Sequence, residues 1–412
     1  MSRILIIGYV WPEPNTTAAG NRMLQLLAAF LDKEHQVIFA STASKTKYSH
    51  DLKAMGITEK QIRLNHSDFD HFMKDLKPVM VVFDRFMIEE QFGWRVAEAC
   101  PTALRILNTE DLHSLREYRE TCFKGHKEWS IDGWLQQDKT KREIASIYRS
   151  DLTLLISSFE AELLSEHLKI NTELLLHLPF MLPTLSDRQQ KDWPSFTERS
   201  GFISFGSGHH APNLDSYRYL KDTIWPLIRK KLPNALLNVY GAYFPQYIHE
   251  MHNPKEGFMV HGWVEHLEEK VKQARFLLAP LRFGAGIKGK LTMAMQNGTP
   301  SITTPIGAEG MGALDWPGHI ANHHDDFVEQ AVQLYEDEKR WNGMQARGIQ
   351  LINSFYSKEV LSKKLFGRLE VLRSALKKHR ATNFVGGILQ HQTIAATKYM
   401  SKWIEEKNKS KM

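Results

Sequence analysis

The chain has 412 residues, which is too many for one ordinary domain and enough for two or three. Hydrophobic residues make up 42% of the sequence and charged residues 24%, a composition that excludes wholesale disorder. The 53 lysines and arginines exceed the 47 aspartates and glutamates, and the net charge of +6 fits an anionic ligand or an acidic membrane surface without requiring nucleic acid.

Two cysteines, Cys100 and Cys122, are too few for a disulfide framework or a zinc cage, so we expect a reducing compartment. The apolar run before Pro12 is shorter than the roughly 7–15 residues of a secretion signal. No stretch approaches the ~20 apolar residues of a membrane span. The sequence therefore predicts a cytoplasmic protein.

Short apolar runs alternate with helical patterns along the first half of the chain. Residues 3–8 (RILIIG) are too few for a helix and predict a buried parallel strand. Residues 22–31 then repeat apolar side chains at helical spacing. Further strands are predicted at residues 35–41, 79–84, 103–108 and 152–157.

A second series of the same kind begins after residues 183–199, which are rich in proline and charge. Strands are predicted at residues 201–206, 235–241, 258–264, 275–281 and 299–304. Strands that alternate with helices indicate parallel sheets with right-handed crossovers. We therefore expect an α/β protein in which two Rossmann-like domains face each other across a cleft.

Ligands of such sheets bind beyond the carboxyl ends of the strands, where helix N-termini and loop amides offer donors. The strongest candidate is the loop after residues 275–281. Its glycines at 284, 286 and 289 allow a ligand close to the backbone, and three cations accompany them: Arg282, Lys288 and Lys290. This combination predicts a diphosphate cradle. The alternative is that the glycines shape turns and the lysines face solvent.

Several segments of the second half together resemble a known family. They are GAGIKGK (284–290), AMQNGTPS (294–301), TPIGAEGM (304–311) and FGSGHHAPNLD (205–215). In combination they resemble the donor-binding core of retaining glycosyltransferase family 4, whose members have the GT-B fold. The resemblance covers about residues 200–350 well and the first domain only in outline.

The resemblance implies a glycosyltransferase that moves a sugar from a nucleotide-diphosphate sugar to an acceptor hydroxyl and retains the anomeric configuration. It implies an acceptor-side domain at residues 1–185, a donor-binding domain at 196–375, and a C-terminal helix with a basic tail at 376–412 that returns to the first domain. It implies no cofactor and no metal, because the nucleotide sugar is a co-substrate. Two alternatives share the fold: a nucleotide-sugar 2-epimerase and a non-catalytic scaffold protein.

Carried onto this sequence, the family pattern gives donor-binding roles to residues of the second domain. The donor side of the cleft would be formed by Gly206, Ser207, His210 and Asn213, with the base against Gly262 and Val264. The diphosphate would lie against Arg282, Lys288 and Lys290, and the sugar or ribose against Gly307, Glu309 and Gly310.

The sequence departs from the family at one informative position. The usual Glu-x7-Glu pair is absent, and Met293 stands where its second carboxylate belongs. A thioether does not accept hydrogen bonds from ribose hydroxyls as a carboxylate does. Either ribose recognition has moved elsewhere or donor binding is weaker.

Two loops of the first half are candidates for the acceptor side. The loop after residues 3–8 carries Asn15, Thr16, Gly20 and Asn21 near a predicted helix start and resembles the first-strand loop of GT-B enzymes. Its alternative is an ordinary capped βα loop. The loop after residues 103–108 carries Glu110, Asp111 and His113, a cluster placed to orient an acceptor hydroxyl. Its alternative is a helix cap with solvated charges.

Together with Arg282 and Lys288, Asp111 and His113 are the predicted catalytic residues. The spacing of Glu110 and His113 also suits a metal, but further ligands are not evident nearby, so we expect none.

The last helical pattern, at residues 388–404, has an apolar stripe beside lysines. It suits a helix that crosses back onto the first domain, and it also suits peripheral contact with an anionic membrane, on the inner membrane face. The expected partners are a nucleotide sugar and a glycan, lipid-linked or small-molecule acceptor. No nucleic-acid partner is expected, because no recognisable module accompanies the positive charge.

Overall fold

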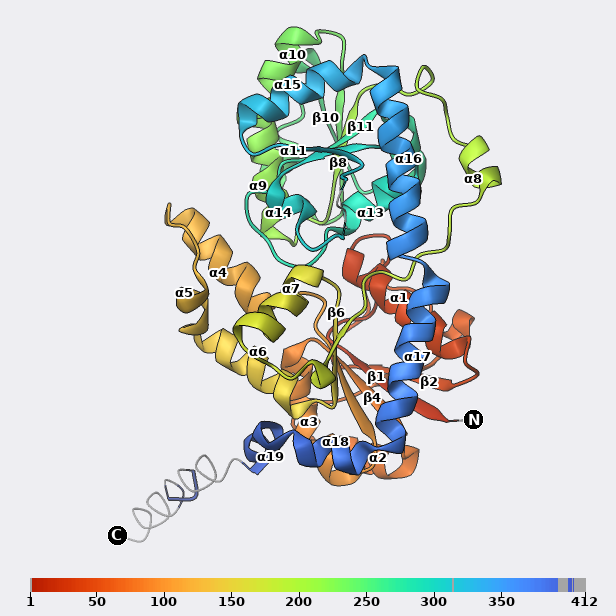
Figure 1. The fold of residues 1–412 in the computed structure, drawn as a ribbon, viewed down its shortest axis with the longest axis vertical. Coiled ribbons are helices and arrows are strands. Elements are labelled where there is room, and N and C mark those ends of the chain that lie inside the picture. The colour runs from red at the N-terminus through yellow and green to blue at the C-terminus, as the bar shows by residue number, and fades with distance from the viewer. Residues whose placement is uncertain (1, 313–314, 392–398, 402, 404–412) are drawn as a thin grey trace.

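The computed structural model describes residues 2–312, 315–391, 399–401 and 403. These residues form two α/β domains, one above the other along the long axis of the molecule (Figure 1). Each domain is built on a sheet whose strand pairs are all parallel, as the alternation of strands and helices predicted.

The first sheet has seven strands in the order β3-β2-β1-β4-β5-β6-β7. Their bounds are β1 Arg3–Gly8, β2 Gln36–Ser41, β3 Thr58–Gln61, β4 Met80–Asp84, β5 Leu104–Asn108, β6 Leu152–Leu155 and β7 Leu175–His177. The helices around it are α1 Ala18–Leu31, α2 Asp68–Leu76, α3 Phe86–Ala99, α4 His113–Lys124, α5 Ile131–Leu135, α6 Asp138–Arg149 and α7 Ser158–Glu162. Helices on both faces explain why β4, β5 and β6 are buried throughout and mostly apolar.

The second sheet has six strands in the order β10-β9-β8-β11-β12-β13. Their bounds are β8 Phe202–Phe205, β9 Leu237–Tyr240, β10 Phe258–Gly262, β11 Phe276–Ala279, β12 Ser301–Thr303 and β13 Gly318–Ile320. The helices of this half are α9 Ala211–Tyr219, α10 Trp225–Lys231, α11 Gln246–His249, α12 Leu267–Gln273, α13 Gly289–Gln296, α14 Pro305–Ala308, α15 His324–Tyr335 and α16 Glu338–Phe355. A short helix, α8 Asp187–Lys191, lies on the segment that joins the two domains.

After α16 the chain crosses back to the first domain. The backbones of Leu182 and Tyr356 meet at the crossing, where the Leu182 N–H donates to the Tyr356 carbonyl at 2.8 Å. Helix α17 (Lys358–Ser374) then buries Leu361, Leu365, Leu369 and Leu372 in the first-domain core. The crossing therefore comes before residue 375, where the sequence-based boundary was placed.

Two further helices, α18 (Leu376–Thr382) and α19 (Phe384–His391), lie along the base of the first domain (Figure 1). Arg380 of α18 makes a bidentate ion pair with Asp151, with both oxygens 2.7 Å away. The predicted helix at residues 388–404 lies largely outside the described residues. Within the described part of the chain, no helix has the length and apolar character needed to cross a bilayer.

The packing of α17 makes a stability prediction. Leu365→Ala removes a fully buried side chain from the first-domain core, so we expect the free energy of unfolding to fall by about 2–5 kcal/mol. The matched control is Val360→Ala on the same helix, which is 61% exposed and should change stability by less than about 0.5 kcal/mol. Urea denaturation followed by tryptophan fluorescence measures both variants, and equal losses would contradict this account of the crossover.

Candidate active site

A cavity of about 360 Å³ lies between the carboxyl ends of the two sheets and is lined by both domains. Most of the predicted site residues line it. From the first domain these are Asn15, Thr16, Asn21, Glu110, Asp111 and His113, and from the second Gly206, Ser207, His210, Asn213, Val264, Lys288 and Lys290. The cavity thus brings together loops that are more than 250 residues apart in sequence.

Two lysines form the cationic part of the cavity wall. Lys288 is the N-cap residue of α13 and Lys290 lies in its first turn. The Lys290 ammonium donates to the Asn213 side chain at 2.8 Å, and the Lys288 ammonium donates to the Ala285 carbonyl at 3.1 Å. Burial lowers the pKa of Lys288 to about 8, and burial together with the Lys288 charge lowers the pKa of Lys290 to about 7. An anion bound here would reverse both shifts, because it stabilises the charged ammonium groups.

The loop before α13 approaches the first domain closely at Gly286. This residue has φ +63°, and a Cβ placed on it would come within 2.8 Å of the Asp111 Cβ. A side chain here would push the two halves of the cavity apart. The glycine that sequence analysis assigned to ligand approach therefore also permits close approach between the domains.

Glu160 of α7 holds this contact in place, and sequence analysis did not identify it. One of its carboxyl oxygens accepts hydrogen bonds from the Gly286 N–H at 2.8 Å and the Leu112 N–H at 3.0 Å. Glu160 is fully buried, and burial, reinforced by the charge of Asp111, raises its pKa to about 8. Its position just after β6, at the carboxyl edge of the sheet, was the available signal.

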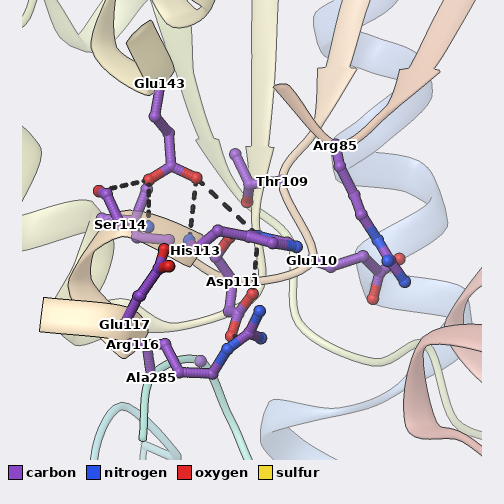
Figure 2. Close-up of polar contacts among 12 residues, drawn as sticks. Arg85, Thr109, Glu110, Asp111, His113, Ser114, Arg116, Glu117, Glu143 and Ala285 are labelled. Carbon is purple, nitrogen blue, oxygen red and sulfur yellow. Dashed lines mark hydrogen bonds and ion pairs between the residues drawn. The ribbon is translucent and has the colours of Figure 1, made fainter. Parts of the chain in front are cut away.

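Asp111 and His113 lie at the start of α4, next to Arg116 (Figure 2). The His113 Nδ1 atom is 3.0 Å from an Asp111 carboxyl oxygen, and Arg116 pairs with the other oxygen. Burial alone would raise the pKa of Asp111, but the charges of Arg116 and His113 outweigh it and hold this pKa well below its ordinary range. Asp111 is therefore a carboxylate with a fixed orientation.

Glu143 fixes the helix that carries His113, and His210 faces this helix from the second domain. Glu143 of α6 accepts the His113 N–H at 2.9 Å and the Ser114 N–H at 3.0 Å, which fixes the first turn of α4. Across the cavity, burial and the nearby charge of Arg116 lower the pKa of His210 to about 4. His210 is thus a neutral imidazole at pH 7, facing an ionised carboxylate on the other domain.

Arg282 does not line this cavity, which corrects its expected place beside the diphosphate. Its guanidinium makes a bidentate ion pair with Asp215, at 2.6 and 2.9 Å. It also stacks between two aromatic rings, 4.7 Å from the centre of Phe123 and 4.3 Å from that of Tyr219. Its partner Asp215, on α9, and Arg282 itself line a separate hollow.

Glu309 and its flanking glycines also lie outside the cavity lining, although they were expected to contact sugar or ribose. The Arg119 guanidinium of α4 donates hydrogen bonds to both Glu309 carboxyl oxygens, at 2.6 and 3.0 Å. It also donates to the Gly284 carbonyl at 3.0 Å. The Gly310 carbonyl accepts from the Ser158 N–H at 3.3 Å. This loop, which includes Gly307, therefore bridges the two domains.

The remaining predicted glycines shape backbone near the cavity. A Cβ on Gly20 would come within 2.5 Å of the Glu13 backbone, so this glycine lets the first loop fold against α1. Gly262 has φ +76°, and its carbonyl accepts the Gly241 N–H at 2.9 Å. Both positions support the wall without lining it.

Met293 lines the cavity from α13, beside Val264 and Leu267. These side chains pack against one apolar cluster of the second domain. The position that differs from the family pattern is therefore part of an apolar wall. Among the described residues, no three or more His, Cys, Asp or Glu side chains gather as a metal site would require. The expected lack of a metal stays a prediction.

Known proteins resemble this chain in one segment and in its fold. A family model described as glycosyl transferases group 1 matches residues 200–337, within the second domain. A search of curated protein sequences found no match. Sucrose-phosphate synthase from Thermosynechococcus elongatus has a similar structure, with a TM-score of 0.68 at 14% identity over 91% of this chain and 100% of that chain.

Two further similar structures contain UDP. Anabaena HepE in complex with UDP-glucose has a TM-score of 0.66 at 9% identity, over 90% of this chain and 100% of that chain. A mutant of S. aureus TarM, in complex with fondaparinux, alpha-GlcNAc-glycerol and UDP, has a TM-score of 0.64 at 10% identity, over 89% and 99%. At such identities the likeness shows the fold alone. The fold is GT-B, as predicted.

The raised pKa of Glu160 predicts how stability depends on pH. Below the ordinary pKa of 4.5 the carboxyl is protonated in both folded and unfolded chains, whereas between 4.5 and about 8 only the folded chain keeps the proton. The contribution of Glu160 to stability should therefore fall by up to about 1.4 kcal/mol per pH unit across this window.

Glu160→Gln tests this directly, because its amide oxygen accepts the same two N–H groups and never ionises. Relative to wild type, the variant should gain stability steadily from pH 4.5 to 8 in urea denaturation. Glu162→Gln, at an exposed position of the same helix, is the control and should follow wild type. A Glu160→Gln curve parallel to wild type would refute the assigned protonation.

Proposed function

We propose that this protein is a glycosyltransferase that moves a sugar from a nucleotide-diphosphate sugar to an acceptor hydroxyl. One observation carries the proposal. Lys288 and Lys290, at the start of α13, share a single cavity with Asp111 and His113 of the facing domain. A site for an anionic leaving group and a site that orients a hydroxyl thus face each other across the space where a sugar would lie.

The second domain would hold the donor. Its diphosphate would lie against the two lysine ammonium groups and the N–H groups at the start of α13, where positive charge is concentrated. The apolar wall of Val264, Leu267 and Met293 would contact the nucleoside. Similar structures bind UDP or UDP-glucose, which supports a nucleotide donor and makes UDP the first ligand to test.

Catalysis would rest on charge stabilisation. As the bond between sugar and diphosphate breaks, negative charge grows on the phosphate oxygens, and cations fixed in a water-poor cavity stabilise it strongly. The leaving phosphate oxygen would then accept the proton of the acceptor hydroxyl. Transfer on one face of the sugar by this route retains the anomeric configuration, and we include retention in the proposal.

The first domain would hold the acceptor. Asp111 is ionised and its oxygens are already close to His113 and Arg116, so its orientation does not depend on the ligand. A fixed carboxylate and imidazole are suited to position a hydroxyl for attack.

Contacts between the domains would exclude water, whose attack on the donor is the competing reaction. Besides the Glu160 and Arg119 bridges, the Tyr243 hydroxyl donates to Glu13 at 2.8 Å and the Tyr48 ring lies 5.2 Å from the Trp263 ring. The structure thus corresponds to a closed arrangement of the two halves.

A cytoplasmic location, a lipid-linked or glycan acceptor and peripheral membrane contact through the C-terminal segment stay predictions. Among the described residues of that segment, exposed apolar side chains occur at Phe384 and Ile388 of α19 and at Tyr399, Met400 and Trp403. Residues 392–398, which continue the predicted amphipathic pattern, lie outside the described residues.

Replacement of Lys288 tests the proposal. We expect Lys288→Ala to weaken UDP binding by roughly 10- to 100-fold, the value of one charge-assisted hydrogen bond to phosphate. Isothermal calorimetry measures the affinity, and release of UDP from UDP-glucose in the presence of candidate acceptors measures transfer. The control is Lys270→Gln on α12, an exposed lysine of the same domain, which should bind UDP as wild type does.

Product analysis separates the alternatives of the same fold. A transferase joins the labelled sugar to an acceptor, whereas a 2-epimerase converts the donor with no acceptor present. Failure of UDP and of every other nucleoside diphosphate to bind would refute the proposal and favour a scaffold protein.

A further inference from the structure

The first-domain wall of the cavity carries a cation that the proposed reaction does not use. Arg85 follows β4 directly and is the N-cap residue of α3. Its side chain lines the cavity and lies beside Glu110 (Figure 2). Arg116, the other arginine of this wall, is already paired with Asp111. Arg85 is therefore the cation of this wall that remains available to a ligand.

Within the described residues, the Arg85 guanidinium donates no hydrogen bond. Its ion pair is a long one, with Nε 4.0 Å from an oxygen of Asp84. The two Asp84 oxygens instead accept from the Tyr9 N–H and the Asn108 side chain, each at 3.3 Å. Only 18% of the Arg85 side chain is exposed, and Nε is buried without a hydrogen-bond partner. Buried donors without acceptors are unfavourable, and an anion in the cavity would satisfy them.

The backbone of Arg85 is held in an unfavourable conformation that directs this side chain. Its φ is +75°, which residues other than glycine rarely adopt. The Arg85 N–H is fixed by the Asn108 carbonyl at 2.7 Å, and the guanidinium lies 4.8 Å from the centre of the Tyr9 ring. Strain of this kind collects at functional sites, where the surrounding structure maintains it. Here it coincides with a guanidinium in a cavity wall whose Nε has no hydrogen-bond partner.

The protonation state of the neighbouring Glu110 affects how much charge Arg85 can offer to a ligand. Arg22 of α1 is fully buried nearby, and its charge acts on Glu110. Burial and the neighbouring Asp84 raise the pKa of Glu110 to about 8, so this carboxyl is mostly neutral at pH 7. The Glu110 carboxyl therefore adds little negative charge beside Arg85, and Asp84 is the acidic side chain that pairs with it, at 4.0 Å.

We propose that the acceptor is an anionic sugar or sugar-like molecule, whose phosphate or carboxylate group binds Arg85 while its accepting hydroxyl faces Asp111 and His113. The inference rests on the proposed function and adds the substrate class. A guanidinium suits either oxyanion because its planar fork donates two parallel hydrogen bonds. The donor diphosphate is taken by the lysines of the opposite wall, so the two anionic sites are separate.

Matched ligands test this binding and distinguish the two oxyanions. Glucose, glucose 6-phosphate and glucuronate are titrated into the protein by calorimetry at constant ionic strength, with and without saturating UDP. We expect at least one of the two anionic sugars to bind about tenfold or more tightly than glucose with UDP present. A preference for glucose 6-phosphate indicates a phosphorylated acceptor, and one for glucuronate indicates an acidic sugar.

Variants of Arg85 test whether this side chain causes the tighter binding of an anionic sugar relative to glucose. Arg85→Asn should abolish it, and asparagine tolerates a positive φ better than most residues, which protects the fold. Arg85→Lys should keep part of it. Arg142→Gln is the control, because it removes an exposed first-domain arginine that pairs with Glu90 outside the cavity.

Unchanged UDP affinity in Arg85→Asn shows that the variant is folded and that the donor site is intact. The inference is overturned if neither anionic sugar binds better than glucose, or if the preference survives in Arg85→Asn. Failure of the wild-type protein to bind UDP and every other nucleoside diphosphate would instead refute the proposed function, so the two failures are distinguishable.

Discussion

The candidate site depends on one buried carboxyl group that joins the two domains. Glu160 accepts backbone N–H groups from Leu112 in the first domain and Gly286 in the second, through the same oxygen atom. The loop that carries Asp111 is thereby held against the loop that leads to Lys288. Without this contact the two walls would be set only by the outer bridges, such as that between Arg119 and Glu309. The contact that holds the domains together therefore also positions the side chains proposed to act in the reaction.

Burial and neighbouring charges give the titratable groups of the cavity different protonation states. Burial lowers the pKa values of Lys288 and Lys290, and an anionic ligand would stabilise their charged forms. Asp111, by contrast, is kept ionised by its cationic neighbours. His210 is kept neutral between them. In the proposed reaction, a nucleotide sugar would supply an anion to the lysines, and the acceptor hydroxyl would donate a hydrogen bond to the carboxylate. By the same reasoning we propose that Arg85, whose guanidinium makes only a long ion pair, binds a second anion carried by the acceptor.

The sequence predicted the fold well because the buried strands are unbroken apolar runs, such as β1 and β4. It missed the edge strands β3, β7 and β13, which are only four, three and three residues long, and β3 is also polar. Loop positions at the carboxyl ends of strands were also predictable, since parallel topology places them at one edge. The partners of Arg282 and Glu309 were not, because Asp215 and Arg119 lie 67 and 190 residues away in the sequence. Glu160 belongs to no motif; its position just after β6 was the only signal in the sequence, and its two long-range hydrogen bonds reveal its role.

The central claim is that the diphosphate of a nucleotide sugar lies on Lys288 and Lys290, opposite Asp111 and His113. A crystal structure of the protein with bound UDP tests it most directly. The account predicts phosphate oxygens within hydrogen-bond distance of both lysine ammonium groups, with the Glu160 contacts intact and Arg282 still paired with Asp215. A diphosphate bound instead at Arg282, or outside the cavity between the domains, would contradict it.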